Sequence, residues 1–372
     1  MNILQLTAHF RPNIGGVETH LDDLCQVLIK KGFNITVLTY RPLETFTKWK
    51  MFEKMGNLEI IRMPWIPNLF YKFIKIPFLE FIYLFPGLFL FTPIVLVTKK
   101  IDVINAHGLV AGFVGVVWGK VFRKKIVVST HSIYNFPKKG IYRDFVSFIF
   151  KNSDFCLGLS KQAAKEIASL GIDKRKVSNF TYWVDLEKFR RVERAKDKLG
   201  WKNKFIVLFV GRLIVEKGIN ELLESAKSWT RGISLKIIGS GSMDKKVKEV
   251  ALEFSNIDFV EGVNHSDLPI YYSGSDVLIV PSTSEEGFGR VIIESLACGT
   301  SVIGSNRGAI PEVLDETVGK LIDISPKNIK NAVEYFYFHP MELKKLAGNC
   351  RKFAERRYSE KNAETIIRTY TN

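Results

Sequence analysis

The chain has 372 residues, of which 46% are hydrophobic and 25% charged, so it is long enough for two domains and too apolar for a disordered protein. Its net charge is +16, yet no zinc finger or other recognisable nucleic-acid-binding module accompanies that charge. Four scattered cysteines, none in a CxxC pair or at zinc spacing, favour a reduced intracellular protein without structural disulfides.

The positive charge is concentrated in the first half of the chain. Residues 1–189 hold 26 Lys and Arg against 14 Asp and Glu, a net of +12, whereas the remainder has a net of +4. A basic half suits an anionic membrane or an acidic substrate, although a generally lysine-rich proteome explains it equally well. The N-terminus lacks the charged-then-apolar order of a signal peptide, so we expect a cytoplasmic protein.

The first half alternates short apolar strands with helices. A strand over 2–7 leads through a loop containing Gly15 and Gly16 into an amphipathic helix over 17–31, which Gly32 ends. Continuous apolar runs, typical of buried parallel strands, predict further strands over 33–39, 102–106, 125–129 and 154–158.

Residues 64–98 interrupt this pattern with many aromatic side chains and 18 uncharged residues between Glu80 and Lys99. That length meets the minimum for a membrane span, but Pro86, Gly87 and Pro93 interrupt it, and a span would separate strands of one sheet. A buried helix pair and a helix lying on the membrane surface are the alternatives. Nearby basic residues favour the surface helix: Lys48, Lys50, Lys54, Lys72 and Lys75.

The second half repeats the alternation of strands and helices. Strands are predicted over 205–210, 234–238, 257–260, 276–281 and 300–305, and the join between the halves lies near 188–197. We therefore predict an α/β protein with two doubly wound Rossmann-like domains, 1–189 and 190–357. Ligands should bind in a cleft between them, at the carboxyl ends of the strands.

Glycine-rich turns follow two of the predicted strands. Backbone N–H groups at Gly15-Gly16 can hold a phosphate, and the turn at 237–242 can approach a nucleotide closely. Each sequence is equally consistent with an ordinary tight turn, and the second does not complete GxGxxG.

Two cations, Arg212 and Lys217, leave the end of the strand 205–210 just before a helix. Arg212 can grip a diphosphate through two donors, and Lys217 adds a point charge. Together they offer a metal-free way to stabilise a departing diphosphate, with a solvated charged loop as the alternative.

The block Glu286-Gly287-Phe288-Gly289 precedes an apolar helical run that contains Glu294. This spacing places Glu286 at a helix N-terminus and Glu294 about one turn inside the helix. Free N–H groups at such a terminus favour an anion, and the glycines permit close approach of a ligand. The block therefore suits a sugar that carries a phosphate.

Histidines follow two strands of the first half. His107 and His131 lie at strand carboxyl ends, facing the proposed cleft, and either is a satisfied polar residue or a member of the reacting centre. The other four histidines form no constellation: His9, His20, His265 and His339.

Taken together, these motifs resemble the retaining glycosyltransferases of the GT-B fold, specifically family 4 with its group 1 C-terminal domain. The resemblance runs nearly end to end, is weakest at 41–100 and is most specific at the Glu286–Glu294 block. Further matching segments are 15–18, 129–131, 159–161, 184–189, 211–218, 280–282 and 297–300.

The resemblance implies a role for each matching residue. Gly16 approaches the donor diphosphate, which Arg212 and Lys217 neutralise as it leaves. Glu286 contacts hydroxyls of the donor sugar and Glu294 binds the ribose. The remaining roles are those of Gly287, Phe288 and Gly289 around the sugar and phosphate, Val263 near the base, and His131 at the reacting centre.

Two residues depart from the family pattern. Trp183 replaces a glycine before the linker, where a bulky ring reshapes the hinge side of the cleft, and Ser301 stands where proline is common. Neither change removes a proposed catalytic residue. The helix expected over 358–372 should cross back onto the N-terminal domain, as in relatives.

The resemblance implies a hexosyltransferase that moves a sugar from a UDP- or GDP-linked donor and retains the anomeric configuration, without cofactor or metal. Retention can proceed by same-face displacement or through a covalent intermediate, and Glu286 is the nearby carboxylate to test as nucleophile. The basic, aromatic first half favours a membrane-linked or polysaccharide acceptor and peripheral contact with the cytoplasmic membrane face, as in envelope polysaccharide or glycolipid synthesis. The alternatives are a soluble enzyme making a disaccharide or glucan and a non-catalytic partner subunit.

Overall fold

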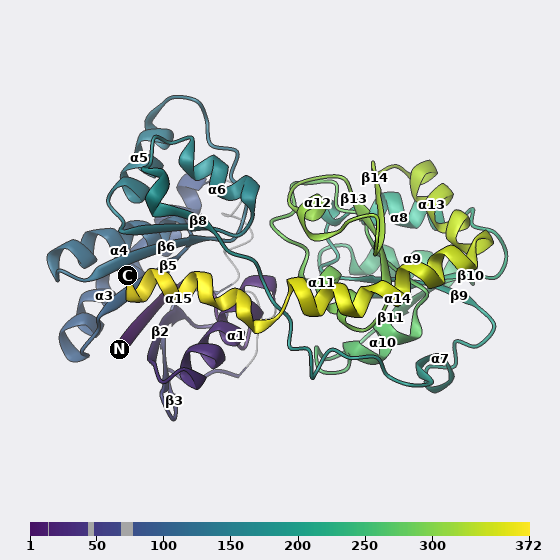
Figure 1. Ribbon diagram of the computed structural model, residues 1–372, viewed down its shortest axis with the longest axis horizontal. Helices are drawn as coiled ribbons and strands as arrows, with labels where there is room; N and C mark the ends of the chain where they lie inside the picture. The colour runs from purple at the N-terminus through teal and green to yellow at the C-terminus, as the bar shows by residue number, and fades with distance from the viewer. Residues whose placement is uncertain (14, 44–47, 68–76) are drawn as a thin grey trace. The chain divides into compact units, whose positions relative to one another are not determined.

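The computed structural model describes residues 1–13, 15–43, 48–67 and 77–372. They form two compact units (Figure 1): unit 1 comprises Met1–Thr181 and Asn362–Asn372, and unit 2 comprises Tyr182–Lys361. Each unit is a mainly parallel sheet covered by helices, so the predicted fold class of two Rossmann-like domains is confirmed.

Unit 1 contains an eight-stranded sheet in the order β3-β4-β2-β1-β5-β6-β7-β8, in which only β3 runs antiparallel to its neighbour. From β1 the chain adds strands first on one side of the sheet and then, from β5 onward, on the other side. The order of strands therefore reverses between β1 and β5, and their carboxyl ends form the switch point of unit 1. The strands are β1 (Asn2–Thr7), β2 (Asn34–Tyr40), β3 (Phe52–Met55), β4 (Leu58–Met63), β5 (Val103–His107), β6 (Lys125–Thr130), β7 (Phe155–Gly158) and β8 (Val177–Asn179).

The helices of unit 1 bury apolar residues against this sheet. Leu21, Leu24 and Leu28 of α1 are buried, as their helical spacing predicts. The helices are α1 (Gly16–Lys30), α3 (Pro77–Thr98), α4 (Leu109–Val121), α5 (Ile141–Lys151), α6 (Lys161–Ala168) and α15 (Ala363–Thr371), with a short 3-10 turn η1 (Lys174–Lys176). A second 3-10 turn, η3 (Glu360–Asn362), lies where the chain returns from unit 2 to unit 1.

The aromatic segment forms a single continuous helix, α3, over the part that is described, despite Pro86 and Pro93 within it. Its inner face packs into the core with Tyr83, Leu84 and Leu88. The Tyr40 hydroxyl contacts both the Leu84 carbonyl and the Leu88 N–H, which ties the helix to the end of β2. Of the segment 64–98, residues 77–98 thus form one helix, while Phe70, Tyr71, Lys72, Phe73 and Lys75 lie outside the described residues.

Unit 2 contains a six-stranded parallel sheet in the order β11-β10-β9-β12-β13-β14, which places the switch point between β9 and β12. The strands are β9 (Phe205–Val210), β10 (Ile233–Ile238), β11 (Ile257–Val260), β12 (Val277–Val280), β13 (Ser301–Ser305) and β14 (Gly319–Ile322). The helices are α7 (Ala195–Lys198), η2 (Val215–Lys217), α8 (Ile219–Ala226), α9 (Asp244–Glu253), α10 (Leu268–Gly274), α11 (Arg290–Ala297), α12 (Ile310–Val313), α13 (Pro326–Phe338) and α14 (Pro340–Arg357).

The chain passes from unit 1 to unit 2 between Thr181 and Tyr182 and returns between Lys361 and Asn362. Unit 2 begins at Tyr182 rather than after residue 189, because Val184 N donates to Tyr358 O and Trp183 is buried. The terminal helix α15 belongs to unit 1, where it lies beside α1 (Figure 1). Lys31 pairs with Glu364, and Asn105 donates to the Tyr370 hydroxyl at 2.6 Å.

Candidate active site

An ion pair between Lys217 and Glu286 occupies the switch point of the unit 2 sheet. Lys217 ends η2, which follows β9, and Glu286 lies in the loop after β12. Strands β9 and β12 are hydrogen-bonded neighbours, so their topology brings together two residues that lie 69 positions apart. Lys217 Nζ donates to Glu286 Oε2 at 2.6 Å and also contacts Oε1, and the two side chains are 21% and 14% exposed.

A glycine fixes the backbone beside this pair. Gly218 has φ +72°, and a Cβ atom there would lie 1.8 Å from the Pro281 carbonyl oxygen. Only glycine permits this approach of the two loops. A backbone hydrogen bond from Thr283 N to Glu216 O, at 3.0 Å, joins the same two loops. The loops after β9 and β12 therefore hold Lys217 against Glu286 through backbone contacts.

Arg212 follows β9 directly, and its side chain is exposed. Within the described part of the chain it has no ion-pair partner, so its guanidinium is available to an anionic ligand at the switch point. The glycine turn after β10 packs against this loop, because a Cβ at Gly239 would lie 1.8 Å from Gly211 O. This close packing explains why a glycine is needed at position 239 without any contact to a ligand.

The N-terminus of α11 carries the Gly287-Phe288-Gly289 segment. Gly289 is the N-cap residue, and no side chain accepts a hydrogen bond from the first N–H groups of the helix. Phe288 is only 5% exposed and packs against Tyr182 and Tyr358, at ring-centroid distances of 5.0 and 6.0 Å. A ligand at this loop therefore meets the backbone of Phe288 rather than its ring.

Glu294 lies one turn inside α11, 2% exposed, and forms three hydrogen bonds. Its Oε1 accepts from His265 Nε2 at 2.9 Å and from Arg290 Nε at 3.1 Å, and its Oε2 accepts from the Tyr272 hydroxyl at 2.9 Å. The carboxylate predicted to bind ribose is thus also the centre of a buried polar cluster in unit 2.

The Glu294 cluster fixes the protonation of its members. Burial alone would raise the pKa of Glu294, but the contacts with His265, Arg290 and Tyr272 outweigh it and lower the pKa below its ordinary value. Burial and the Glu294 charge raise the pKa of Tyr272 well above its ordinary range. Lys188 Nζ lies 3.2 Å from His265 Nδ1; since Lys can only donate, His265 Nε2 carries the hydrogen that Glu294 accepts.

In unit 1, Gly16 is the first residue of α1, one position before the predicted start of this helix at Val17. The space where a Cβ of Gly16 would lie is open to 4 Å, and no side chain caps the helix. Glu18 lies in the first turn, with its carboxylate against Gly15. A diphosphate at this helix end would have to share it with the Glu18 charge.

His107 and His131 meet at the carboxyl edge of the unit 1 sheet. His107 ends β5, His131 follows β6, and their Nδ1 and Nε2 atoms lie 2.9 Å apart. Both rings are buried, and burial lowers the pKa of each, that of His131 to about 3. Burial therefore favours the neutral form of the His131 ring.

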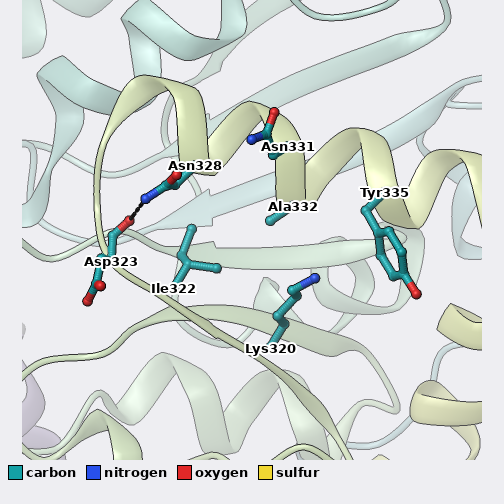
Figure 2. Close-up of a pocket in the computed structure, with 7 residues that line it drawn as sticks. All are labelled: Lys320, Ile322, Asp323, Asn328, Asn331, Ala332 and Tyr335. Carbon is teal, nitrogen blue, oxygen red and sulfur yellow. Dashed lines mark hydrogen bonds between the residues drawn. The ribbon is translucent and has the colours of Figure 1, made fainter.

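The remaining predicted residue, Val263, is half-buried in the loop after β11, two positions before His265. A surface hollow in unit 2, lined by Lys320, Asp323 and Asn328 among others, contains none of the predicted residues (Figure 2). Its polar groups are engaged locally: Asn328 donates to Asp323 O at 2.9 Å, and Lys320 lies 4.3 Å above the Tyr335 ring centre.

Four residues near the predicted sites were missed by the sequence analysis. His265 and Tyr272 surround Glu294, Gln5 contacts His107, and the His20 ring lies 5.7 Å from that of His131. The sequence alone does not predict these contacts of His20 and His265, because their partners His131 and Glu294 lie far away along the chain. Once the order of strands in each sheet is known, residues on loops and helices next to a strand end become candidates for such contacts.

Two family models match the chain and divide it as its motifs do. Glycosyltransferase Family 4 matches residues 14–188, and Glycosyl transferases group 1 matches residues 191–357. An uncharacterized 41.2 kDa protein from the cps region of Klebsiella pneumoniae is 30% identical over 70% of this chain and 75% of that protein. An uncharacterized glycosyltransferase of Methanocaldococcus jannaschii is 24% identical over 98% of this chain and 96% of that protein.

Solved structures show the same fold along the whole chain. Sucrose-phosphate synthase from Thermosynechococcus elongatus superposes with a TM-score of 0.82 at 22% identity, covering 100% of this chain and 98% of that one. Anabaena Alr3699/HepE in complex with UDP gives a TM-score of 0.78 at 18% identity, covering 100% of both chains. From its family models, its relatives and its fold, the chain belongs to the group 1 glycosyltransferases of the GT-B type.

Proposed function

We propose that this glycosyltransferase moves a hexosyl group from a UDP- or GDP-linked sugar to a membrane-linked or polysaccharide acceptor and retains the anomeric configuration. The observation that carries the proposal is the Lys217–Glu286 pair at the unit 2 switch point, where Lys217 and the exposed Arg212 both follow β9. A switch point is where open α/β sheets bind nucleotides.

The charges at the unit 2 switch point suit the departure of the diphosphate from the donor sugar. Negative charge grows on the leaving diphosphate as its bond to the sugar breaks, and Arg212 and Lys217 are the cations that stabilise it. Lys217 Nζ has three N–H donors, of which Glu286 occupies two, so one remains for a phosphate oxygen. This arrangement neutralises the diphosphate with side chains alone, and we propose metal-independent chemistry without a cofactor.

The roles of the two glutamates differ in this proposal. Glu286 is partly exposed and takes the donor-sugar hydroxyls, while its bond to Lys217 orients the carboxylate. Glu294 takes the ribose hydroxyls through the lone pairs that its protein partners leave. Val263 and the backbone of 287–289 complete the donor site of unit 2. For unit 1 we propose that Gly16 binds a phosphate and that His131 takes part in the reaction.

Similar proteins support a nucleotide-sugar donor and a lipid acceptor. Structures of Anabaena HepE hold UDP-glucose or UDP with glucose. A phosphatidylinositol N-acetylglucosaminyltransferase subunit of Arabidopsis thaliana is 24% identical over 90% of this chain and 74% of that protein. The similarity to sucrose-phosphate synthase favours the second candidate, a soluble enzyme that makes a disaccharide or glucan.

Helix α3 offers a surface for peripheral membrane contact. It is long and apolar enough to cross a membrane, and in unit 1 its inner face packs into the core. The outer face is apolar too, with five side chains each more than half exposed: Phe78, Ile82, Leu90, Ile94 and Val97. An exposed apolar helix face on a unit with net positive charge suits insertion among the headgroups of an anionic membrane.

Changing this face should weaken membrane binding. Wild-type protein is expected to float with vesicles that contain phosphatidylglycerol at low salt, and Leu90→Gln with Ile94→Gln should lower the bound fraction at least about tenfold, because each buried aliphatic side chain contributes about 1.5 kcal/mol or more. Leu252→Gln, which changes an exposed leucine of α9 in unit 2, is the matched control. Absence of wild-type binding at low salt would favour the soluble candidate.

A thermal-shift screen with UDP- and GDP-sugars tests the donor assignment. A donor that binds only the folded protein raises its melting temperature, by an amount that grows with ligand concentration over Kd. We expect one nucleotide class to raise the melting temperature of the wild type and not that of Arg212→Ala. A protein that responds to neither class would be the non-catalytic partner subunit.

A further inference from the structure

The loop that carries Glu286 lies between two other loops at the carboxyl edge of the unit 2 sheet. Strand β12, which precedes this loop, pairs with β9 on one side and with β13 on the other. The loop after β9 contacts it through Lys217 and Gly218. Residues 306–309, which follow β13 and are called the β13 loop, make a second set of contacts from the opposite side.

Gly308 and Ala309 of the β13 loop pack directly against the backbone of Glu286. Ala309 N donates to Glu286 O at 2.8 Å. A Cβ atom at Gly308 would lie 2.5 Å from both the backbone nitrogen and the backbone oxygen of Glu286. Gly308 also has a φ of +57°, so its own conformation and its surroundings both favour glycine. A side chain at position 308 would therefore displace the main chain of Glu286.

Arg307 fastens the same loop three residues before Glu286. Its Nη1 donates to Thr283 O at 3.1 Å, while Thr283 N donates to Glu216 O in the loop after β9. Thr283 is thus held by one neighbouring loop through its N–H and by the other through its carbonyl. The Arg307 side chain is exposed, so its replacement should leave the core of unit 2 intact.

The β13 loop is a firm support because it is anchored at both ends. Asn306 N donates to Ile322 O, at the end of β14, at 2.9 Å. At the other end, Ala309 and Ile310 at the start of α12 are fully buried. Close-packed interiors transmit strain rather than absorb it, so a loop fixed in this way determines where the Glu286 backbone lies.

We propose that Arg307, Gly308 and Ala309 are positioning residues that hold Glu286 where its carboxylate reaches both Lys217 and a hydroxyl of the donor sugar. The inference rests on the proposed role of Glu286 in the donor site. Relief of the 2.5 Å contacts in Gly308→Ala requires a movement of about 1 Å, and a displacement of that size at a reacting centre lowers a rate about 10²-fold.

Nitrogen-15 NMR of the full chain, labelled at lysine, reads the Lys217–Glu286 pair without any substrate. Hydrogen bonds to both carboxylate oxygens slow the exchange of the Nζ hydrogens with water, so Lys217 should give an ammonium signal, assigned by its loss in Lys217→Ala. Glu286→Ala and Gly308→Ala should each lose or shift this signal. An unchanged signal in Gly308→Ala, or no such signal in the wild type, would overturn the positioning role.

Gly299→Ala is the matched control for strain at a glycine with positive φ. Gly299 has a φ of +81° and lies just before β13, so alanine there meets a comparable backbone cost. Its Cβ would lie at an ordinary 3.6 Å from Arg191 Nη1, away from the carboxyl edge that carries Glu286. We expect Gly299→Ala to keep the Lys217 signal.

The kinetic test asks whether Gly308 acts through Glu286. Release of nucleoside diphosphate is measured with UDP-glucose and with GDP-mannose as donor. Gly308→Ala should lower kcat at least about tenfold in the wild-type background but less than about twofold in the Glu286→Ala background, because a positioning residue then has nothing left to position. Equal losses in the two backgrounds would show a merely structural role and contradict the proposal.

Arg307→Met repeats this comparison at an exposed position, where loss of folding is not expected. One hydrogen bond from a charged donor is removed, so kcat should fall about threefold to tenfold, and Arg307→Lys should recover part of the loss. A fall of the same size in the Glu286→Ala background would again contradict the proposal. A wild type that releases neither nucleotide would refute the proposed function, while the Lys217 signal would still decide whether the β13 loop holds Glu286.

Discussion

Replacing Glu286 with alanine is expected to lower kcat for glycosyl transfer by about 10²–10³-fold, the usual effect of removing one preorganised electrostatic group. Glu286 holds Lys217 Nζ through both carboxylate oxygens, so the change removes the proposed sugar contact and also releases the cation that stabilises the diphosphate. The measurement is steady-state release of nucleoside diphosphate with the donor that the thermal-shift screen identifies.

Two variants separate these effects of Glu286. Glu285→Ala removes the neighbouring exposed carboxylate and should leave kcat within about twofold of the wild type, as surface changes usually do. Lys217→Ala should reduce kcat by a similar factor to Glu286→Ala, and the double variant should lose less than the product of the two, because the residues act as a unit. Wild-type activity in Glu286→Ala would refute its assigned role.

Glu294→Ala is expected to destabilise unit 2 by about 3 kcal/mol or more, since breaking a buried charge pair leaves an uncompensated charge. Arg290, His265 and Tyr272 would each lose their bond to the carboxylate. Urea denaturation followed by fluorescence measures the change in the free energy of unfolding, with Glu285→Ala as the matched control. A loss below about 0.5 kcal/mol would show that the cluster contributes little to the fold.

The same cluster predicts a pH dependence. The folded-state pKa of Glu294 is lowered, so its contribution to stability is fully present above the unfolded pKa of about 4.3 and is lost as the pH falls through the folded pKa. The difference in unfolding free energy between wild type and Glu294→Ala should therefore be constant near pH 7 and shrink below about pH 4. A difference that grows on acidification would contradict the lowered pKa.

The sequence predicted the fold best where strands are continuous apolar runs. Strands β1, β9 and β11 begin and end at the predicted residues. Strands β3 and β4 were missed because Glu53, Glu59 and Arg62 interrupt their apolar residues, so neither is the continuous apolar run that indicates a buried strand. Arg62 is nevertheless buried, since Glu53 and the Arg11 carbonyl satisfy its guanidinium.

The residue types at the candidate site were predictable, but their partners were not. The motifs identified Lys217, Glu286 and Glu294 one by one, each as a ligand for a different part of the donor. That Lys217 binds Glu286 depends on β9 and β12 being neighbours, which is a property of sheet order rather than of any local sequence. Likewise, Gln5 contacts His107 only because β1 lies beside β5 in the sheet.

In the proposed reaction, Arg212 and Lys217 at the unit 2 switch point bind the donor diphosphate. Isothermal titration of UDP and of GDP into the wild type, Arg212→Ala and Arg231→Ala tests it most directly, because Arg231 is an exposed arginine that precedes β10, at the amino edge of the same sheet. We predict that one nucleotide binds the wild type and Arg231→Ala equally, and Arg212→Ala at least about tenfold more weakly, as expected for a lost charge-assisted contact. Equal affinity in all three proteins would contradict the claim.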